Sequence, residues 1–152
     1  MRVSAKTDYA LRAAVELAAA EGGPPVKGER LATSQSIPLR FLENILLQLR
    51  HAGIVESRRG ADGGYKLARP PEEITLADVI RAIDGPLAGV SGQRPETLDF
   101  KGTSEPLRDV WIAVRASLRG VLEGVTLADV ASGGLPDHVR SLTDEPDAWL
   151  PH

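Results

Sequence analysis

The spacing of apolar residues predicts three short helices in the first half of the chain, at residues 4–20, 28–34 and 38–52. In the third helix, apolar side chains recur every three or four residues and should face the core; they are Leu39, Leu42, Ile45, Leu46 and Leu49. Its other face carries Arg40, Asn44, Leu47 and His51, with Glu43 beside it. We therefore expect this helix to present a mainly polar surface to solvent.

Directly after this helix, the pattern changes to two short strands, at residues 54–58 and 65–69. Gly53 stands where a helix end favours a left-handed residue. The segment between the strands, RGADGG at residues 59–64, is rich in glycine, which suits a sharp hairpin tip that lies close to another surface. A helix backed by a small hairpin is typical of a winged helix-turn-helix: the helix fits the major groove of DNA, and an arginine-bearing hairpin fits the minor groove or the phosphates. The expected fold class is therefore mainly α with a small β-hairpin wing.

A long helix at residues 104–124 dominates the second half of the chain, with Ser104 as its expected cap and Pro106 in its first turn. Its apolar side chains form one continuous stripe, which includes Leu107, Val110, Trp111, Val114, Leu118 and Val121. Such a stripe can lie in the core of the chain or in a contact between two subunits. Because the unit of helices and hairpin predicted before this helix is small, we favour the second possibility and interpret the long helix as a dimerisation helix.

The predicted organisation has four parts. Residues 1–85 form a winged helix-turn-helix DNA-binding domain, 86–103 a loop, 104–132 the dimerisation helix with a short closing helix, and 133–152 a loosely ordered tail. The tetrapeptide Thr-Leu-Ala-Asp occurs at 75–78 and again at 126–129, which predicts the same capped helix start twice. The loop shows no periodicity, and a connection of that length is usually functional or disordered.

Composition narrows the class of protein. The chain contains no cysteine, which excludes disulfides, thiolate nucleophiles and thiolate-bound metals. It has no apolar run of roughly 18 residues and no signal-like start, so we expect a soluble, cytoplasmic protein without membrane contact. An enzyme is not expected, because no nucleophile motif, phosphate loop or cluster of metal ligands is present.

The net charge of −3 hides a split between the two halves of the chain. Residues 1–70 hold 11 Lys and Arg against 7 Asp and Glu, whereas residues 71–152 hold 7 against 14. A basic N-terminal half fits contact with DNA phosphates, although chance clustering on a solvated surface would give the same count.

Several motifs occur in the order typical of one family. They are VSAKTDYA at 3–10, FLENIL at 41–46, LRHAG at 49–53, VESRRGADGGY at 55–65, ITL at 74–76, VW at 110–111 and TLAD at 126–129. In these motifs the chain resembles the IscR/NsrR-type family (the Rrf-two superfamily) of dimeric bacterial winged-helix regulators. At residue 38 it departs from the family pattern, because a proline stands where a serine cap is common.

This resemblance implies a homodimer held by the long C-terminal helix, with each third helix presented to one half-site of pseudo-palindromic double-stranded DNA. In such relatives the positions of Arg40, Glu43 and Asn44 face base edges, and the position of Arg59 enters the minor groove. The side-chain chemistry agrees, because Arg can bind guanine, Asn can bind adenine and Glu can accept from cytosine. Arg59 beside Gly60 is a thin cationic probe that suits a narrow minor groove. Alternatively, Arg40 and Glu43 form an ordinary surface ion pair.

Three further residues are expected at the phosphates, namely Tyr9, Arg50 and Arg58, since most protein–DNA hydrogen bonds go to the backbone. The function predicted is that of a sequence-specific transcriptional regulator, a repressor because relatives usually block promoters. The alternative is a protein–protein adaptor on a winged-helix scaffold that no longer binds DNA. The exposed apolar residue Leu47 is compatible with both functions, because it could contact a partner protein in an adaptor or a thymine methyl group in a DNA-binding regulator.

Relatives that sense iron, oxygen or nitric oxide hold an iron–sulfur cluster through cysteines in the segment that matches residues 86–103. This chain has no cysteine, and its histidines at 51, 138 and 152 are scattered, so no cofactor and no metal is expected. Three readings of the regulatory signal remain open: a small-molecule effector, a partner protein, or no effector. The 86–103 loop and Trp111 are the candidate positions for an inducer.

Overall fold

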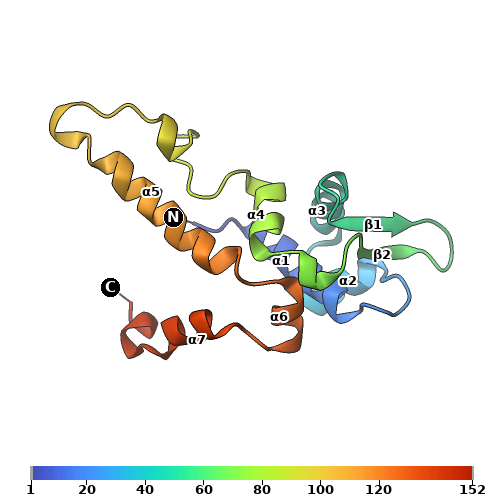
Figure 1. The fold of residues 1–152 in the computed structure, drawn as a ribbon. Coiled ribbons are helices and arrows are strands. Elements are labelled where there is room, and N and C mark those ends of the chain that lie inside the picture. The colour runs from blue at the N-terminus through green and yellow to red at the C-terminus, as the bar shows by residue number, and fades with distance from the viewer. Residues whose placement is uncertain (1, 152) are drawn as a thin grey trace.

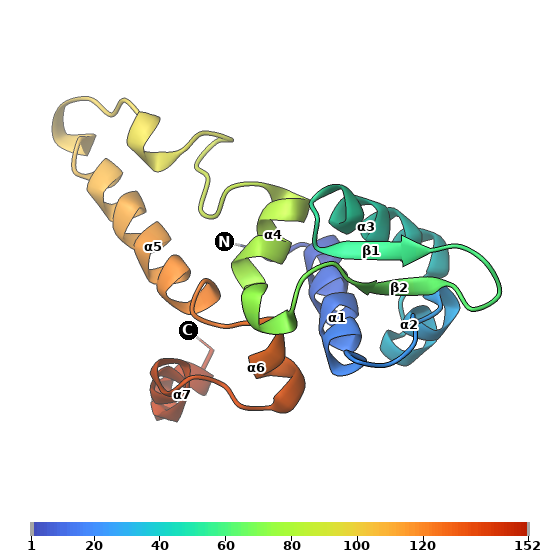
Figure 2. The ribbon, with the colours of Figure 1, turned by 45° about the vertical axis from the view of Figure 1, so that its right-hand side comes forward.

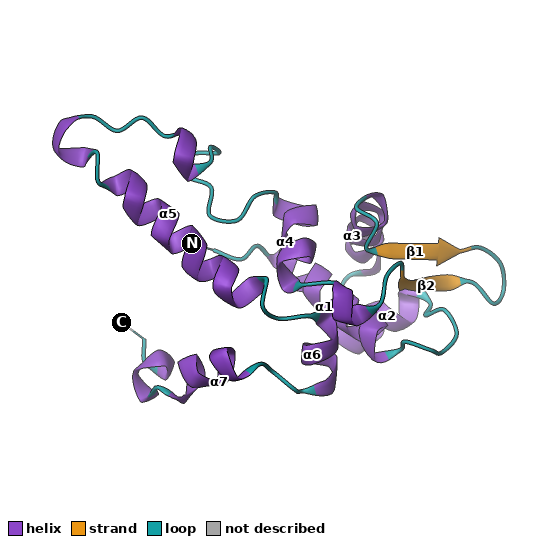
Figure 3. Cartoon of the chain, in the orientation of Figure 1, coloured by secondary structure: helices purple, strands orange, loops and turns teal. Residues whose placement is uncertain are grey.

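The computed structural model describes residues 2–151, which form helices and one two-stranded sheet (Figures 1 and 3). The α-helices are α1 (Ala5–Ala19), α2 (Gly28–Gln35), α3 (Leu39–His51), α4 (Leu76–Asp84), α5 (Leu107–Leu122), α6 (Leu127–Ser132) and α7 (Asp137–Asp144). The strands are β1 (Val55–Arg58) and β2 (Gly64–Leu67), and 3₁₀ turns lie at Pro71–Glu73, Pro95–Thr97, Gly102–Ser104 and Pro146–Trp149. The predicted fold class, mainly α with a hairpin wing, is confirmed. The histidine at position 152 lies outside the described residues.

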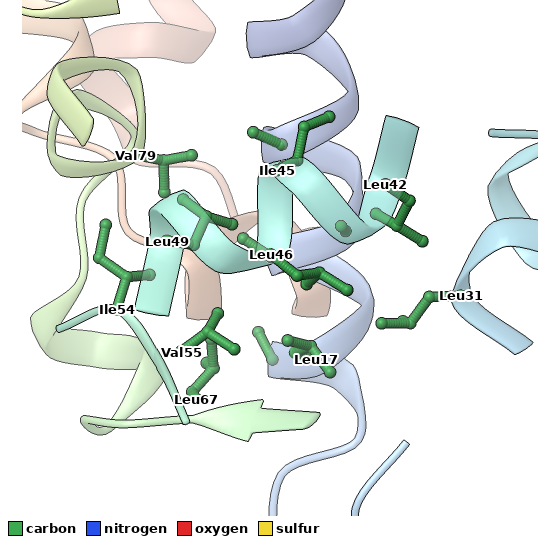
Figure 4. Close-up of a cluster of buried hydrophobic side chains, with 14 of the residues drawn as sticks. Leu17, Leu31, Leu42, Ile45, Leu46, Leu49, Ile54, Val55, Leu67 and Val79 are labelled. Atoms are coloured by element: carbon green, nitrogen blue, oxygen red, sulfur yellow. The ribbon is translucent and has the colours of Figure 1, made fainter. Parts of the chain in front are cut away.

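The core of the head forms where α1, α3 and the hairpin meet (Figure 4). Four of the five leucine and isoleucine residues predicted to face inward from α3 are fully buried: Leu42, Ile45, Leu46 and Leu49. The prediction for Leu39 was wrong, because its side chain is 37% exposed. Side chains on a helix lean toward its N-terminus, so at the first residue of α3 the side chain projects past the end of the core.

The hairpin that follows α3 is antiparallel, with Val55 opposite Leu67 and Arg58 opposite Gly64. Val26, which precedes α2, adds a single bridge to Tyr65 of β2 and so ties the hairpin to the start of the helix-turn-helix. Hydrogen bonds in both directions, Val26 N to Tyr65 O at 2.9 Å and Tyr65 N to Val26 O at 2.8 Å, form that bridge. The wing is therefore anchored to the same segment that positions α2.

The two Thr-Leu-Ala-Asp segments both form capping boxes, at the starts of α4 and α6, as predicted. Thr75 and Thr126, the two caps, also lie opposite each other in an antiparallel bridge. Leu76 N donates to Val125 O at 3.0 Å, and Leu127 N donates to Ile74 O at 2.9 Å. Because Leu127 is fully buried, α6 joins the core of the head, where it packs on α1.

Helix α5 extends away from the head, as Figures 1 and 2 show. It begins at Leu107, not at Ser104, whose predicted role as cap was wrong. The Ser104 hydroxyl donates to Lys101 O at 2.8 Å within a 3₁₀ turn, and Pro106 takes the N-cap position without a side-chain cap. None of the residues of α5 is buried in the single chain.

The segment predicted as an unstructured loop between α4 and α5 has local order. Val90 and Gln93 exchange backbone hydrogen bonds across a tight turn, and the turn residues Ser91 and Gly92 both have positive φ. Leu87 and Pro95 are buried, and the 3₁₀ turn at Pro95–Thr97 packs against α5. The loop is therefore held between the head and α5.

The end of the chain, where the sequence predicts only a loosely ordered tail, contains the short helix α7 and a final 3₁₀ turn. Neither element has a buried residue, and the apolar side chains of Leu142, Trp149 and Leu150 are exposed. No helix within residues 2–151 combines the length and the apolar character needed to cross a membrane.

Candidate nucleic-acid interface

One face of α3 carries exposed polar side chains, because the helix buries its opposite face. Arg40, Glu43 and Asn44 are all exposed and lie within four residues of one another, so a single groove could receive them together. Arg40 and Glu43 form no ion pair with each other or with any other group within residues 2–151. The alternative prediction of a surface pair is therefore wrong in this structure, and both side chains are free for a ligand.

Asn44 is oriented by a neighbour one turn further along α3. The Gln48 side-chain amide donates to Asn44 Oδ1 at 3.0 Å. This bond leaves the Asn44 amide N–H groups and one oxygen lone pair available, which is what a bidentate contact to adenine needs. The sequence analysis did not single out Gln48, although its spacing of four from Asn44 is the signal that could have found it.

The wing brings two further arginines to the side of α3. Arg58 ends β1 and Arg59 follows it, and both are exposed with no hydrogen bond or ion pair in the described part of the chain. Lys27, which caps the start of α2, reaches the wing tip and donates through Nζ to Ala61 O at 2.7 Å and to Gly60 O at 3.3 Å. Lys27 was missed by the sequence analysis, and its contact can be seen only in the fold because 33 residues separate it from Gly60.

Backbone geometry fixes the turn that presents these arginines. A Cβ built on Gly63 would lie 2.2 Å from Arg58 O, and one built on Gly64 would lie 2.6 Å from Val26 O. Only glycine fits both places without a backbone shift, so the close approach predicted from the glycine-rich tip is to the protein's own chain.

The residues predicted at the phosphates have different surroundings. Arg50, at the end of α3, donates through Nη1 to Ser57 Oγ of β1 at 3.0 Å, which links the helix to the wing. Tyr9 of α1 is half-buried and packs edge-on against Phe41, with ring centroids 5.8 Å apart, while the Arg12 guanidinium lies 5.6 Å from the Tyr9 ring centroid. Arg50 and Tyr9 thus belong to different elements, α3 and α1.

No arrangement for a metal is found among residues 2–151: no three His, Cys, Asp or Glu side chains come together there in a way that could hold an ion. Asp8, in the first turn of α1, forms an ion pair with Arg12 at 2.5 Å.

A helix-turn-helix with an exposed polar second helix and a basic hairpin beside it defines the winged helix-turn-helix transcriptional regulators. A family model described as "Iron-dependent Transcriptional regulator", Rrf2, matches residues 3–133. The chain belongs to the Rrf2 family of transcriptional regulators, and with no cysteine it is a member that lacks the cluster ligands. It is a regulator and not an enzyme, as the sequence predicts.

Three relatives illustrate the similarity. Rv1287 of Mycobacterium tuberculosis, a candidate HTH-type transcriptional regulator, is 54% identical over 145 residues, which cover 95% of this chain and 90% of that protein. The structure of CymR, the global cysteine regulator of B. subtilis, has a TM-score of 0.75 at 35% identity and covers 87% of this chain and 97% of the other. The structure of T. potens IscR has a TM-score of 0.69 at 33% identity, and the match covers 100% of this chain and 93% of the other.

Proposed function

We propose that the protein is a homodimeric repressor that binds pseudo-palindromic double-stranded DNA in the cytoplasm. The observation that carries this proposal is the set of exposed polar and basic side chains on α3 and on the wing that follows it. Arg40, Glu43 and Asn44 are exposed on α3, and Arg58 and Arg59 are exposed on the wing. None of the three arginines forms an ion pair within residues 2–151. Unpaired cations on a rigid helix and hairpin are suited to a polyanion.

Each residue takes the role that its geometry allows. Arg40, Glu43 and Asn44 read base edges in the major groove, with Asn44 oriented by Gln48. Arg59 enters the minor groove, where the small Gly60 beside it permits close approach. Tyr9, Arg50 and Arg58 hold the phosphates on either side and set the register of α3 in the groove.

The dimer is proposed to form through α5. Its apolar stripe is partly or fully exposed in the single chain and lines an open groove of about 610 Å³. The residues assigned to the seam are Leu107, Val110, Trp111, Val114, Leu118 and Val121. An apolar helix face left to water is unfavourable, and a second copy related by a two-fold axis would cover it with the same residues. Two heads joined in this way match two half-sites of DNA.

Repression is proposed to act by occupancy of the promoter. Apart from the head, which α6 joins, the described chain consists of the loop, α5, and α7 with its final 3₁₀ turn, so a bound dimer would block access to the DNA rather than present a large second domain. Control of this occupancy is assigned to a small molecule or to a partner protein, without an iron–sulfur cluster.

The first test is selection of sheared genomic DNA by the purified protein at about 150 mM salt, a condition under which nonspecific phosphate binding is weak. We expect a few fragments that share a pseudo-palindrome, and Arg59→Ala should lose them. Arg140→Ala, at an exposed position of α7, is the matched control and should recover the same fragments. If the wild-type protein enriches no sequence, DNA binding is refuted and the adaptor interpretation is favoured.

The second test concerns the seam. Val114→Glu combined with Leu118→Glu should give monomers in sedimentation, because two charges would be buried without partners. Arg108→Glu, on the exposed start of the same helix, should leave the dimer intact. A stable dimer of the double variant would refute the assignment of α5 as the interface.

A further inference from the structure

A cavity of about 490 Å³ lies between the end of α4, the 86–103 loop and α5, separate from both the DNA-binding face and the apolar groove. Four arginines line it: Arg81 from α4, Arg94 from the loop, and Arg115 and Arg119 from α5. This volume is within the range of about 300–1,000 Å³ that is typical of small-molecule sites. The lining charge is unusual because like charges brought together repel one another.

The carboxylates at the cavity neutralise only part of this charge. Glu123 accepts hydrogen bonds from Arg81 and Arg119, the latter at 3.0 Å, and Glu96 accepts one from Arg115. The hydrogen bond from Arg81 is the main cause that lowers the pKa of Glu123, so this carboxylate is ionised at neutral pH. Four guanidinium groups thus stand against these two carboxylates at the cavity.

Two nearby aspartates offset part of the arginine charge, because hydrogen bonds from neutral donors leave a carboxylate negative. Asp78 approaches Arg81 to 4.0 Å, and its Oδ2 accepts from the Thr75 backbone N–H in the capping box of α4. Asp84 accepts from the hydroxyls of Ser4 and Thr7, the latter at 2.5 Å.

Arg94 is the residue that distinguishes a ligand site from a structural clamp. Its side chain makes no hydrogen bond and no ion pair within residues 2–151, although its charge acts on Glu96 and it lines this cavity and, together with Asp84, an adjoining one of about 320 Å³. The other three arginines of the cavity each bond a carboxylate. A guanidinium that lines the cavity without a hydrogen bond is instead a donor fork without its acceptor.

We propose that this cavity, which we call the arginine cleft, binds a small organic anion with at least two acidic groups. Phosphate and carboxylate share the chemistry required, since a guanidinium fork can bind either through two parallel hydrogen bonds. Leu87, which is buried at the base of the loop, gives the cleft one apolar wall for the carbon frame of such a molecule. Two acidic groups would let one molecule bridge guanidinium groups of different elements.

The position of the arginine cleft gives the ligand a regulatory role, a step that rests on the proposed function. Arg81 belongs to the head, Arg94 to the loop, and Arg115 and Arg119 to the helix assigned to the dimer seam. An anion held by all of them would fix α5 relative to the head, and thereby the spacing of two reading helices on DNA.

The direct test is calorimetric titration of the full chain, without DNA, with inorganic pyrophosphate and separately with citrate, in chloride buffer at constant ionic strength. We expect at least one of them to bind saturably at one site per chain, with a Kd of about 1 mM or tighter. Arg94→Gln should weaken that binding by about tenfold or more, because it removes a charged donor. This variant breaks no hydrogen bond and no ion pair within residues 2–151, so its fold should be unchanged.

The control variant is Arg108→Gln, which removes the same charge from the exposed start of α5, outside the cleft, and should bind as the wild type does. Binding of pyrophosphate alone would identify a phosphate-bearing ligand, and binding of citrate alone a carboxylate ligand. No saturable binding of either anion, or equal binding by Arg94→Gln, would overturn the proposal. Because this assay contains no DNA, a protein that binds the anion but selects no DNA would refute the proposed function and leave the arginine cleft standing.

Discussion

Gly63, in the tip of the wing, is the position where one added methyl group should weaken both the folded state and DNA binding. The residue is buried, and a Cβ at this position would lie 2.2 Å from Arg58 O, 2.8 Å from the carbonyl carbon of Arg59 and 2.9 Å from that of Arg58. All three atoms belong to the backbone, so no side-chain rotation can make room. In Gly63→Ala the turn itself must shift.

The size of the effect follows from these distances. Contacts under 3.0 Å are essentially never tolerated, so the wing backbone must move by several tenths of an ångström or more. Forcing an extra methyl group into a packed place costs about 1–3 kcal/mol. Because the wing lies outside the buried core of α1 and α3, we expect most of the shift to be absorbed as displacement of the two wing arginines, Arg58 and Arg59.

We therefore expect Gly63→Ala to lower the free energy of unfolding by about 1–3 kcal/mol and to weaken operator binding by about tenfold or more, as the loss of one groove contact would. Urea unfolding and titration of a labelled operator fragment measure the two quantities. Ala61→Ser, which enlarges an exposed residue of the same turn, should leave both unchanged. If Gly63→Ala keeps both the wild-type stability and the wild-type affinity, the argument from close backbone approach is refuted.

Three further predictions concern other parts of the molecule. Thr7→Val should lower the free energy of unfolding, measured in urea, by about 1–2 kcal/mol, because Asp84 loses its buried hydroxyl donor. Thr7→Ser should restore most of this stability. Equal stability of Thr7→Val and the wild type would show that the hydrogen bond is unimportant. Arg50→Gln should weaken DNA binding about equally on all sequences and reduce the salt slope by about one; a change confined to one base pair would instead make Arg50 a base reader. The lowered pKa of Glu123 means that its pairing with Arg81 stabilises the fold above the ordinary carboxyl value of 4.5 and that this contribution is lost as the pH falls below it. Chemical unfolding at several pH values should accordingly show that the free energy of unfolding falls less on acidification in Glu123→Gln than in the wild type. Identical decreases in the two proteins would contradict this assignment.

The strongly periodic parts of the fold could be predicted from sequence. The four buried positions of α3 repeat at helical spacing, and the threonine caps of α4 and α6 need only the residue three places further on, so local pattern suffices for both. The exact ends of the helices were harder to predict. Ser104 has the composition of a cap, but the 3₁₀ turn before Pro106 uses its hydroxyl as a donor.

In the candidate sites too, some features could be predicted from sequence and others could not. Exposure of Arg40, Asn44 and Arg59 follows from the helix face and the hairpin, and could be predicted. Contacts that depend on tertiary packing could not. Lys27 reaches the wing from another element, and the four arginines of the cleft are spread over α4, the loop and α5, where nothing in their spacing places them around one cavity.

The bridge between Thr75 and Thr126 has a consequence for how such a protein can diversify. The chain leaves the head after α4 and returns to it at Val125, which is buried, and the bridge holds this return point against the start of α4. Residues 85–125 are therefore an excursion that ends at a fixed point on the head. The entropy of closing a loop grows slowly with its length, by about 0.6 kcal/mol for each doubling. Insertions, deletions or exchange of that excursion therefore leave the folding of the DNA-reading head nearly unaffected. The head can stay constant in evolution while the segment that carries the proposed dimer helix and the proposed anion site changes.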